Sequence, residues 1–269
     1  SMHSVTDSSG PSGRILSKTF FFPGFVAGTG GLLRERDILA QHERWQHDER
    51  SCRRLLLNEL SLDAIPQSAA DALWISVFTY ESAALASWFT AMAEGDEPII
   101  CLVPQGKVLA SIAEYLGRKS PLAPGDVVGL GALTIAVIPF LTQDDYDRLL
   151  SLCDLNLVRG EDSFVRAQWA AQPLLWHIYP QDDGIHMDKL RAFLVLYCGE
   201  SSGAASQELK ALRQFWEFWN LGEDCRELWH HLRPQLPGLR EQARKWQQEL
   251  AQMPDLAANL VSYHRQQQC

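Results

Sequence analysis

The five residues from Arg159 to Ser163 read R-G-E-D-S and place a cation, a glycine, two carboxylates and a hydroxyl in one short segment. Gly160 allows the backbone to approach a ligand closely, and Arg159 can hold a diphosphate through two hydrogen bonds. Asp162 or Ser163 can cap a following helix, whose free N–H groups would then face an anion. Glu161 can accept hydrogen bonds from sugar or ribose hydroxyls. The segment therefore predicts an anion and sugar site, whereas in about half of cases such a pattern marks only a helix start.

Aromatic and amide side chains occupy other segments that follow apolar runs of the chain. In a parallel sheet the turns after the strands meet at one edge, which is where ligands bind. We therefore expect aromatic rings, amides and the R-G-E-D-S segment to come together at that edge. The aromatic and amide residues are Phe78, Tyr80, Phe140, Gln143 and Tyr179.

Five short apolar runs, separated by helical patterns, must position these turns. Each run is rich in residues that favour β-strands, and apolar residues at helical spacing follow it. Thr142 to Asp145 has the pattern of a capping box, which predicts a helix start there. Near-continuous apolar strands indicate a parallel sheet covered on both faces, so we predict a Rossmann-like α/β/α fold. The runs are residues 74–78, 99–103, 133–138, 154–158 and 174–178.

From about residue 183 the pattern is wholly helical, which predicts helices appended to the sheet. Four tryptophans lie in this part, at Trp216, Trp219, Trp229 and Trp246. We interpret them as core anchors between helices, favoured roughly four to one over a ligand-binding role.

The first residues are polar and small. Residues 1–18 are expected to be a tag remnant and a linker, because Ser1-Met2 resembles a cloning scar and the next residues cannot bury a core. Residues 19–269 are expected to form one domain with its terminal helices. A linker followed by an abrupt apolar strand suggests that the chain is the later part of a longer protein.

Charge and hydropathy exclude several classes of protein. The 269 residues carry 24 Lys and Arg against 33 Asp and Glu, a net charge of −9, which argues against broad nucleic-acid or anionic-membrane binding. The absence of an apolar run of 18 residues and of a signal peptide leads us to expect a soluble protein. The six cysteines are scattered, which favours reduced thiols and a cytosolic protein over a disulfide framework.

The sequence contains no pattern typical of a metal site or of several common enzymes. His230-His231 point to opposite helix faces, and His177 is interpreted as a structural histidine, roughly twice as probable as a catalytic one. The dinucleotide-binding, P-loop and nucleophile-elbow motifs are all absent. We interpret the charged run from Glu43 to Arg53 as a solvated helix face, and Lys107 as a surface lysine.

Seven segments together resemble the EarP family of bacterial protein-arginine rhamnosyltransferases. The resemblance runs from about residue 14 to the end, and its most specific part is the pair V-R-G-E-D-S-F-V-R-A-Q-W-A and W-H-I-Y-P-Q. The segments are residues 20–25, 29–35, 102–107, 131–134, 143–150, 158–170 and 176–181.

The resemblance implies a GT-B glycosyltransferase fold, of which this chain would be the carboxyl-terminal, donor-binding half. It implies transfer of L-rhamnose from dTDP-β-L-rhamnose to an arginine of translation elongation factor P in the bacterial cytoplasm, with inversion and without a metal or other cofactor. The family's amino-terminal half, with its proposed catalytic aspartate, is expected to be missing from this chain. That half is therefore an expected partner, as are the donor and elongation factor P.

The resemblance also implies roles for individual residues. Aromatic side chains and an amide would hold the thymine and nucleoside, and a charged set would bind the diphosphate and the ribose or rhamnose. Glu161 would have a supporting catalytic role. The implied donor-binding residues are Phe78, Tyr80, Phe140, Gln143, Arg159, Glu161, Asp162, Ser163 and Tyr179.

Two other functions remain open on the sequence. A catalytically silent module could bind dTDP-sugars through the same pocket. A purely structural α/β interaction domain is the third alternative, and it leaves the clustering of aromatic residues with the R-G-E-D-S segment unexplained.

Overall fold

A computed structural model describes residues 3–7, 16–20, 22–181, 183–199 and 206–266. By its internal contacts the chain divides into two compact units. One comprises Ser1–Ile38 with Gln247–Cys269, and the other comprises Leu39–Trp246. The predicted turns all belong to the second unit.

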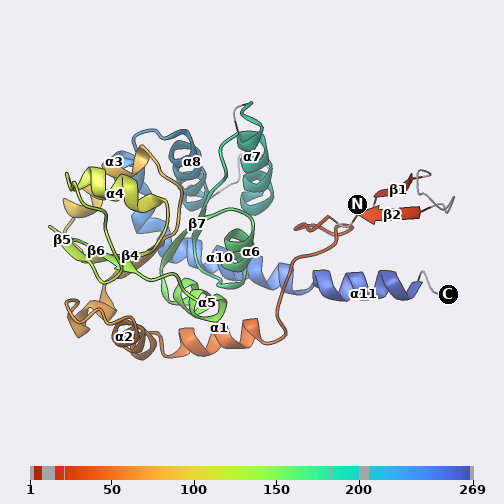
Figure 1. The fold of residues 1–269 in the computed structure, drawn as a ribbon, viewed down its shortest axis with the longest axis horizontal. Coiled ribbons are helices and arrows are strands. Elements are labelled where there is room, and N and C mark those ends of the chain that lie inside the picture. Colours follow the sequence, from red (N-terminus) through yellow and green to blue (C-terminus); the bar gives the residue numbers. More distant parts are fainter. Residues whose placement is uncertain (1–2, 8–15, 21, 182, 200–205, 267–269) are drawn as a thin grey trace. The chain divides into compact units, whose positions relative to one another are not determined.

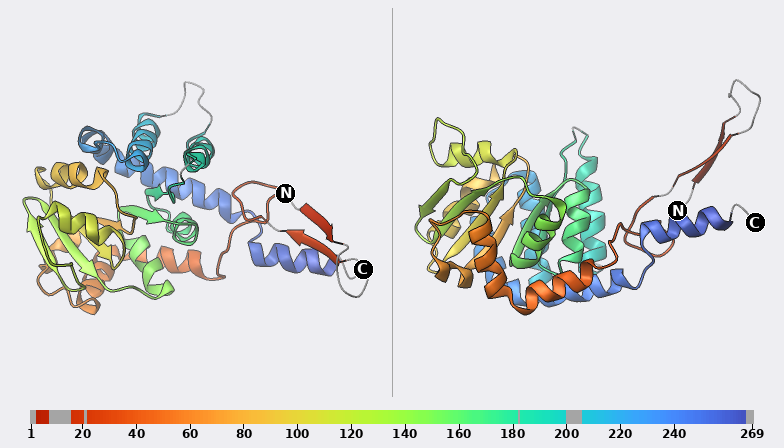
Figure 2. Two further views of the ribbon diagram at one scale, coloured as in Figure 1. Left: turned by 45° about the horizontal axis from the view of Figure 1, so that its top comes forward. Right: turned by 60° about the horizontal axis from the view of Figure 1, so that its bottom comes forward.

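A six-stranded sheet forms the centre of the second unit, in the order β5-β6-β4-β3-β7-β8 (Figure 1). All neighbouring strands are parallel except β5 and β6. In Figure 2 these strands lie side by side with helices packed around them. The strands are β3 (Leu73–Val77), β4 (Ile99–Pro104), β5 (Val127–Leu130), β6 (Leu133–Ile138), β7 (Leu155–Arg159) and β8 (Leu174–His177).

The five predicted strands are confirmed, and β5 is an additional strand that the sequence did not indicate. It is short, only partly buried and interrupted by Gly129, so it lacks the apolar pattern of the others. A tight turn reverses the chain into β6 at Gly131, whose φ is +54°. A Cβ atom there would lie 2.1 Å from the Ala93 carbonyl oxygen, so the turn requires glycine.

The strand order reverses direction between β3 and β7. From β3 the chain proceeds to β4 and β6 on one side, and then crosses to β7 and β8 on the other. Such a switch point opens a crevice at the carboxyl ends of the two central strands. The turn that begins at Phe78 and the turn at Gly160 flank this crevice.

Helices cover both faces of the sheet, as predicted. α3 and α4 lie on one side and α2 and α5 on the other (Figure 1). The expected helix start at Thr142 is confirmed, because its side chain accepts a hydrogen bond from the Asp145 N–H at the head of α5. The helices before the appended part are α1 (Ile38–His47), α2 (Glu49–Glu59), α3 (Ala84–Ala93), α4 (Val108–Tyr115), α5 (Gln143–Leu152) and α6 (Asp162–Trp169).

The appended part is helical, also as predicted. Trp216, Trp219, Trp229 and Trp246 are all buried, which confirms their interpretation as core anchors. Trp88 of α3 packs edge-on against Trp219 and Trp229, so this part shares a core with the sheet. The helices are α7 (Ile185–Cys198), α8 (Gln207–Leu221), α9 (Arg226–Leu232), α10 (Leu236–Ala251) and α11 (Leu256–Gln266).

The first unit contains a pair of antiparallel strands, β1 (His3–Asp7) and β2 (Leu16–Phe20). The segment predicted as a linker up to residue 18 thus contains β1 and the start of β2. Within this unit α11 holds the glycine-rich segment, since Asn259 Nδ2 donates to the Gly30 carbonyl oxygen at 2.9 Å. Across the residues that the structure describes, no helix is long and apolar enough to cross a membrane.

Candidate functional site

A cavity of about 190 Å³ lies at the carboxyl edge of the sheet, where the sequence predicted a site. Five of the predicted residues line it: Phe78, Phe140, Gln143, Asp162 and Ser163. Five further residues, which the sequence analysis did not select, complete the wall: Pro104, Leu141, Thr142, Tyr146 and Arg166.

Aromatic rings form one wall of the cavity. The Phe78 ring meets the Phe140 ring edge-on at 6.3 Å between centroids and the Tyr146 ring at 5.8 Å. Phe140 is 71% exposed, although it is a large apolar side chain. Tyr146 is buried at the inner end, and burial raises the pKa of its phenol. An exposed phenylalanine beside a cavity provides an apolar face that a planar ligand can cover.

Arg159 joins the cavity wall to two of the remaining predicted residues. Its guanidinium lies 4.5 Å from the centroid of the Phe78 ring and 5.1 Å from that of Tyr80. The Tyr80 ring in turn contacts Tyr179 at 5.5 Å. Burial raises the pKa of Tyr80, while the positive charge of Arg159 acts in the opposite direction. Phe78 therefore links a cavity group to a second group made of Arg159, Tyr80 and Tyr179.

The turn after β7 has the predicted geometry but not the predicted cap. Gly160 has φ +65°, and a Cβ atom there would lie 3.8 Å from the Tyr80 hydroxyl. Glu161, not Asp162 or Ser163, is the N-cap residue of α6, and it makes no side-chain capping hydrogen bond within this described segment. Asp162 and Ser163 are the first two helical residues, so the predicted cap is wrong. The first N–H groups of α6 consequently have no side-chain cap to compete with an incoming anion.

Glu161 is exposed at the head of α6. Its negative charge contributes to the raised pKa of Tyr80, which places it near that ring. It lies outside the set of residues that line the cavity.

A buried support holds the R-G-E-D-S turn from behind. Trp176 Nε1 donates to the Gly160 carbonyl oxygen at 2.8 Å, and the Trp176 ring stacks on Phe164 at 4.1 Å. Asn220 of α8 donates to the Trp176 carbonyl oxygen at 2.9 Å and accepts from the Ile178 N–H at 3.0 Å. Asn220 is a polar residue in an apolar helix pattern, and this was the only signal in the sequence that could have identified it.

His177 belongs to the same support. It is buried, and its ring packs against Tyr80 at 5.3 Å and Trp219 at 6.0 Å. Burial, with the nearby Arg159 charge, lowers the pKa of His177 to about 4, so the ring is neutral at pH 7. These contacts favour the predicted structural role.

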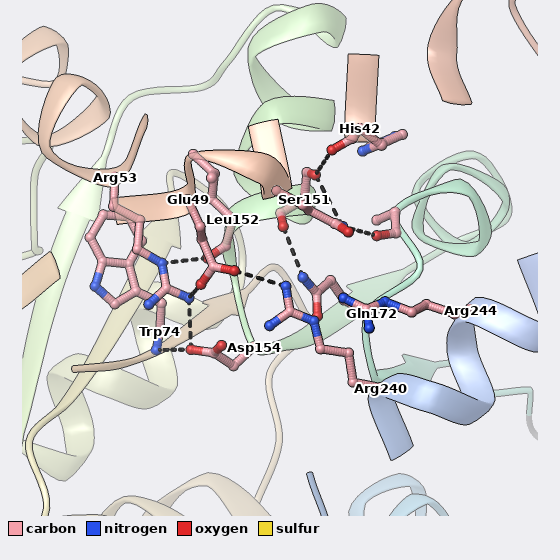
Figure 3. Close-up of polar contacts among 12 residues, drawn as sticks. His42, Glu49, Arg53, Trp74, Ser151, Leu152, Asp154, Gln172, Arg240 and Arg244 are labelled. Atoms are coloured by element: carbon pink, nitrogen blue, oxygen red, sulfur yellow. Dashed lines mark hydrogen bonds and ion pairs between the residues drawn. The ribbon is translucent and has the colours of Figure 1, made fainter. Parts of the chain in front are cut away.

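The opposite, amino-terminal edge of the sheet holds a network of charged side chains (Figure 3). Arg53 of α2 contacts Glu49 at 2.7 Å and Asp154 at 2.9 Å. Asp154 also accepts from the Trp74 N–H at 2.8 Å, and Glu49 contacts Arg240 of α10 at 2.8 Å. Arg53 is 4% exposed, so the interpretation of the run from Glu43 to Arg53 as a solvated face is wrong at this residue. One charge of the run points inward because α2 packs against α5, where Arg53 donates to the Leu152 carbonyl oxygen at the end of that helix.

Other residues considered in the sequence lie on the surface. His230, His231 and Lys107 are exposed, and Lys107 precedes α4. Among the described residues, no group of three or more histidine, cysteine, aspartate or glutamate side chains could hold a metal ion.

Comparison with known proteins relates this fold to one family. Residues 1–265 match the family described as "Elongation-Factor P (EF-P) rhamnosyltransferase EarP". The chain is 49% identical over 251 residues to the protein-arginine rhamnosyltransferase of Pseudomonas putida, and 47% identical over 249 residues to that of Pseudomonas aeruginosa. Both alignments cover 93% of this chain and 64% of the relative, so the chain spans just under two thirds of their length.

A solved structure is also similar. It is described as "Structural basis for EarP-mediated arginine glycosylation of translation elongation factor EF-P". The chain matches it with a TM-score of 0.81 at 45% identity, covering 92% of this chain and 76% of that chain.

Proposed function

The chain belongs to the EarP family, and on that premise we propose that it is the donor-binding part of a protein-arginine rhamnosyltransferase. The donor is dTDP-β-L-rhamnose, and the acceptor is an arginine of translation elongation factor P. The observation that carries the proposal is the cavity at the switch point, where aromatic rings, Arg159 and the open head of α6 converge.

The proposed architecture is one half of a GT-B glycosyltransferase, acting in the bacterial cytoplasm. Residues 19–269 would be its carboxyl-terminal domain, after a linker up to residue 18. The opposing domain would supply the catalytic base and much of the acceptor contact. Support comes from the relative in Pseudomonas putida, of which this chain matches 64%, so that a large part of the relative lies outside the match.

The cavity suits a nucleoside diphosphate in three respects. Phe78 and Phe140 offer apolar faces to the thymine, and the Gln143 side chain lines the same cavity. The first N–H groups of α6, at Asp162 and Ser163, offer donors to the diphosphate. Arg159 contacts the cavity residue Phe78, and Tyr80 and Tyr179 follow it outside the cavity; these three residues would contact the part of the nucleotide that extends beyond the cavity.

The proposed reaction inverts the anomeric carbon. A guanidine nitrogen of the acceptor forms a bond to that carbon as the bond to the dTDP oxygen breaks, and the nitrogen loses a proton to the base of the opposing domain. Negative charge grows on the departing diphosphate, so a fixed cation and helix N–H groups lower the barrier. Arg159 and the head of α6 would provide both, without a metal or other cofactor. Glu161 would orient the rhamnose through its hydroxyls.

Calorimetry with dTDP, UDP and NADH tests the binding step. We expect dTDP to bind best, and Arg159→Ala to weaken it by roughly 10- to 100-fold, the loss of a charge-assisted contact. Arg191→Ala, at an exposed position of α7, is the matched control and should bind like the parent chain. Parent binding to NADH but not to dTDP would contradict the proposal.

A second assay separates an enzyme from a silent dTDP-sugar-binding module. Rhamnose transfer to elongation factor P is measured with and without the amino-terminal portion of a relative. We expect transfer only when both portions are present. Donor binding without transfer under every condition would favour the silent module.

A further inference from the structure

A buried ion pair joins α5 to α6 directly behind the cavity. Arg166 Nε lies 2.6 Å from Asp147 Oδ1, and a second guanidinium nitrogen of Arg166 contacts Asp147 Oδ2. The two side chains are 5% and 2% exposed. Two parallel contacts between a planar guanidinium and a carboxylate fix orientation as well as distance.

Each partner lies one helical turn behind a residue that lines the cavity. Asp147 follows Gln143 by four residues in α5, and Arg166 follows Asp162 by four residues in α6. Residues four apart lie on the same helix face, about 6 Å apart along the axis. Arg166 itself lines the inner end of the cavity. The pair therefore sets how far apart the heads of the two helices stand.

Burying two charges is costly, and a buried pair is often no more stabilising than apolar residues of similar volume. Such a pair can nevertheless specify one arrangement of the elements that it joins. Here the joined elements are α5 and α6, the two helices that bring Gln143, Asp162 and Ser163 to the cavity.

We propose that Asp147 and Arg166 form a positioning pair, which holds the heads of α5 and α6 at the separation that the bound nucleotide requires. This inference rests on the function proposed above. Asp147 lies outside the cavity lining and acts through Arg166 and α6, and neither side chain takes part in bond breaking.

The same sheet provides a matched control at its opposite edge. Arg53 and Asp154 form an ion pair at 2.9 Å, with side chains 5% and 21% exposed. That pair joins α2 to the start of β7 and lies away from the cavity-lining residues. Breaking it should lower stability without moving the heads of α5 and α6.

The test compares dTDP affinity of Asp147→Asn with that of Asp154→Asn, at a temperature where both variants are fully folded. We expect Asp147→Asn to weaken dTDP binding by roughly tenfold or more. Asp154→Asn should stay within about twofold of the parent. The direction of the change in dTDP affinity is informative, because Asp147→Asn removes a negative charge near the cavity. A purely electrostatic effect would tighten binding of an anion, so unchanged or tighter binding overturns the proposal.

Arg166→Lys separates geometry from charge. Lysine keeps the positive charge but cannot make two parallel contacts. We expect weakened dTDP binding in this variant as well. Full recovery of parent affinity would show that Arg166 acts through its charge alone, which contradicts a positioning role.

Amide hydrogen exchange gives a readout that needs no ligand. Asp147→Asn should accelerate exchange in the first turns of α5 and α6, whereas Asp154→Asn should leave them unchanged. Unaltered exchange in Asp147→Asn overturns the proposal even if the parent chain fails to bind dTDP. Failure of the parent to bind, with accelerated exchange, contradicts the proposed function alone.

Discussion

The two edges of the central sheet use charged side chains in different ways. At the amino-terminal edge Arg53, Glu49, Asp154 and Arg240 contact one another in a network of ion pairs. At the carboxyl edge Arg159 lies over the rings of Phe78 and Tyr80, and Phe78 lines the cavity. The ion pairs of Arg53 connect secondary-structure elements. Arg159 instead lies on a ring beside a cavity, where its positive charge can also interact with a ligand. We therefore place the proposed ligand site at the carboxyl edge and assign a stabilising role to the ion pairs at the amino-terminal edge.

The largest expected effect on stability comes from breaking the ion pairs at the amino-terminal edge. Arg53→Met leaves Asp154 and Glu49 without their central cation, so the free energy of unfolding should fall by about 3–5 kcal/mol. Urea denaturation measures it. dTDP affinity of the folded variant should remain that of the parent. A variant that loses affinity while fully folded would show that the two edges are coupled.

A smaller effect concerns two buried histidines, His42 in α1 and His177 at the carboxyl edge. Burial is the main cause that lowers the pKa of His42 to about 3 and that of His177 to about 4, from an ordinary value of 6.5. The unfolded chain therefore binds protons that the folded chain does not, and stability falls as pH drops below 6.5. Between pH 7.5 and 5 each histidine should contribute a loss of about 2 kcal/mol.

Urea denaturation of His42→Gln across that pH range tests this expectation. The variant should lose less stability than the parent between pH 7.5 and 5. Exposed His230 supplies the control, since His230→Gln should follow the parent curve. Identical pH profiles for the parent and His42→Gln would show that His42 is protonated in the folded chain.

The smallest expected effects on stability distinguish the amino-terminal ends of α5 and α6, which both lie at the cavity. Thr142→Ala should lower the free energy of unfolding by about 1 kcal/mol, because Thr142 caps α5. Ser163→Ala should change it by less than about 0.5 kcal/mol, since Ser163 lies inside α6 and does not cap it. Thermal denaturation compares the two variants. A larger loss for Ser163→Ala than for Thr142→Ala would contradict this assignment of the caps.

Local sequence patterns predicted the strands and turns whose positions are determined by short segments of the chain. Buried parallel strands are continuous apolar runs, so all five were found, while β5 is half-exposed, contains Gly129 and carried no such signal. The candidate site was predictable as a set of turns, because the edge at which parallel strands end is fixed by topology.

What escaped prediction depends on tertiary packing. Arg53 is one charge among many in its helix, and only the packing of α2 against the end of α5 determines that it is buried. Tyr146 has the spacing of a core residue and also lines the cavity. The N-cap residue of α6 is Glu161 and not Asp162 or Ser163, because the chain turns at Gly160 and the helix begins two residues later.

The strand order also governs when the binding edge can form during folding. Ile75 of β3 pairs with Leu155 of β7, so about 80 residues separate two strands that lie side by side. Phe78 and Arg159, at the ends of these strands, meet only after this long loop closes. Pairings so distant in the chain form slowly, because the entropy of closure is lost before the contacts compensate for it. The contact between the Phe78 ring and the Arg159 cation is therefore expected late, after the local hairpin of β5 and β6. A growing chain on the ribosome cannot form the proposed donor site until α6 has emerged.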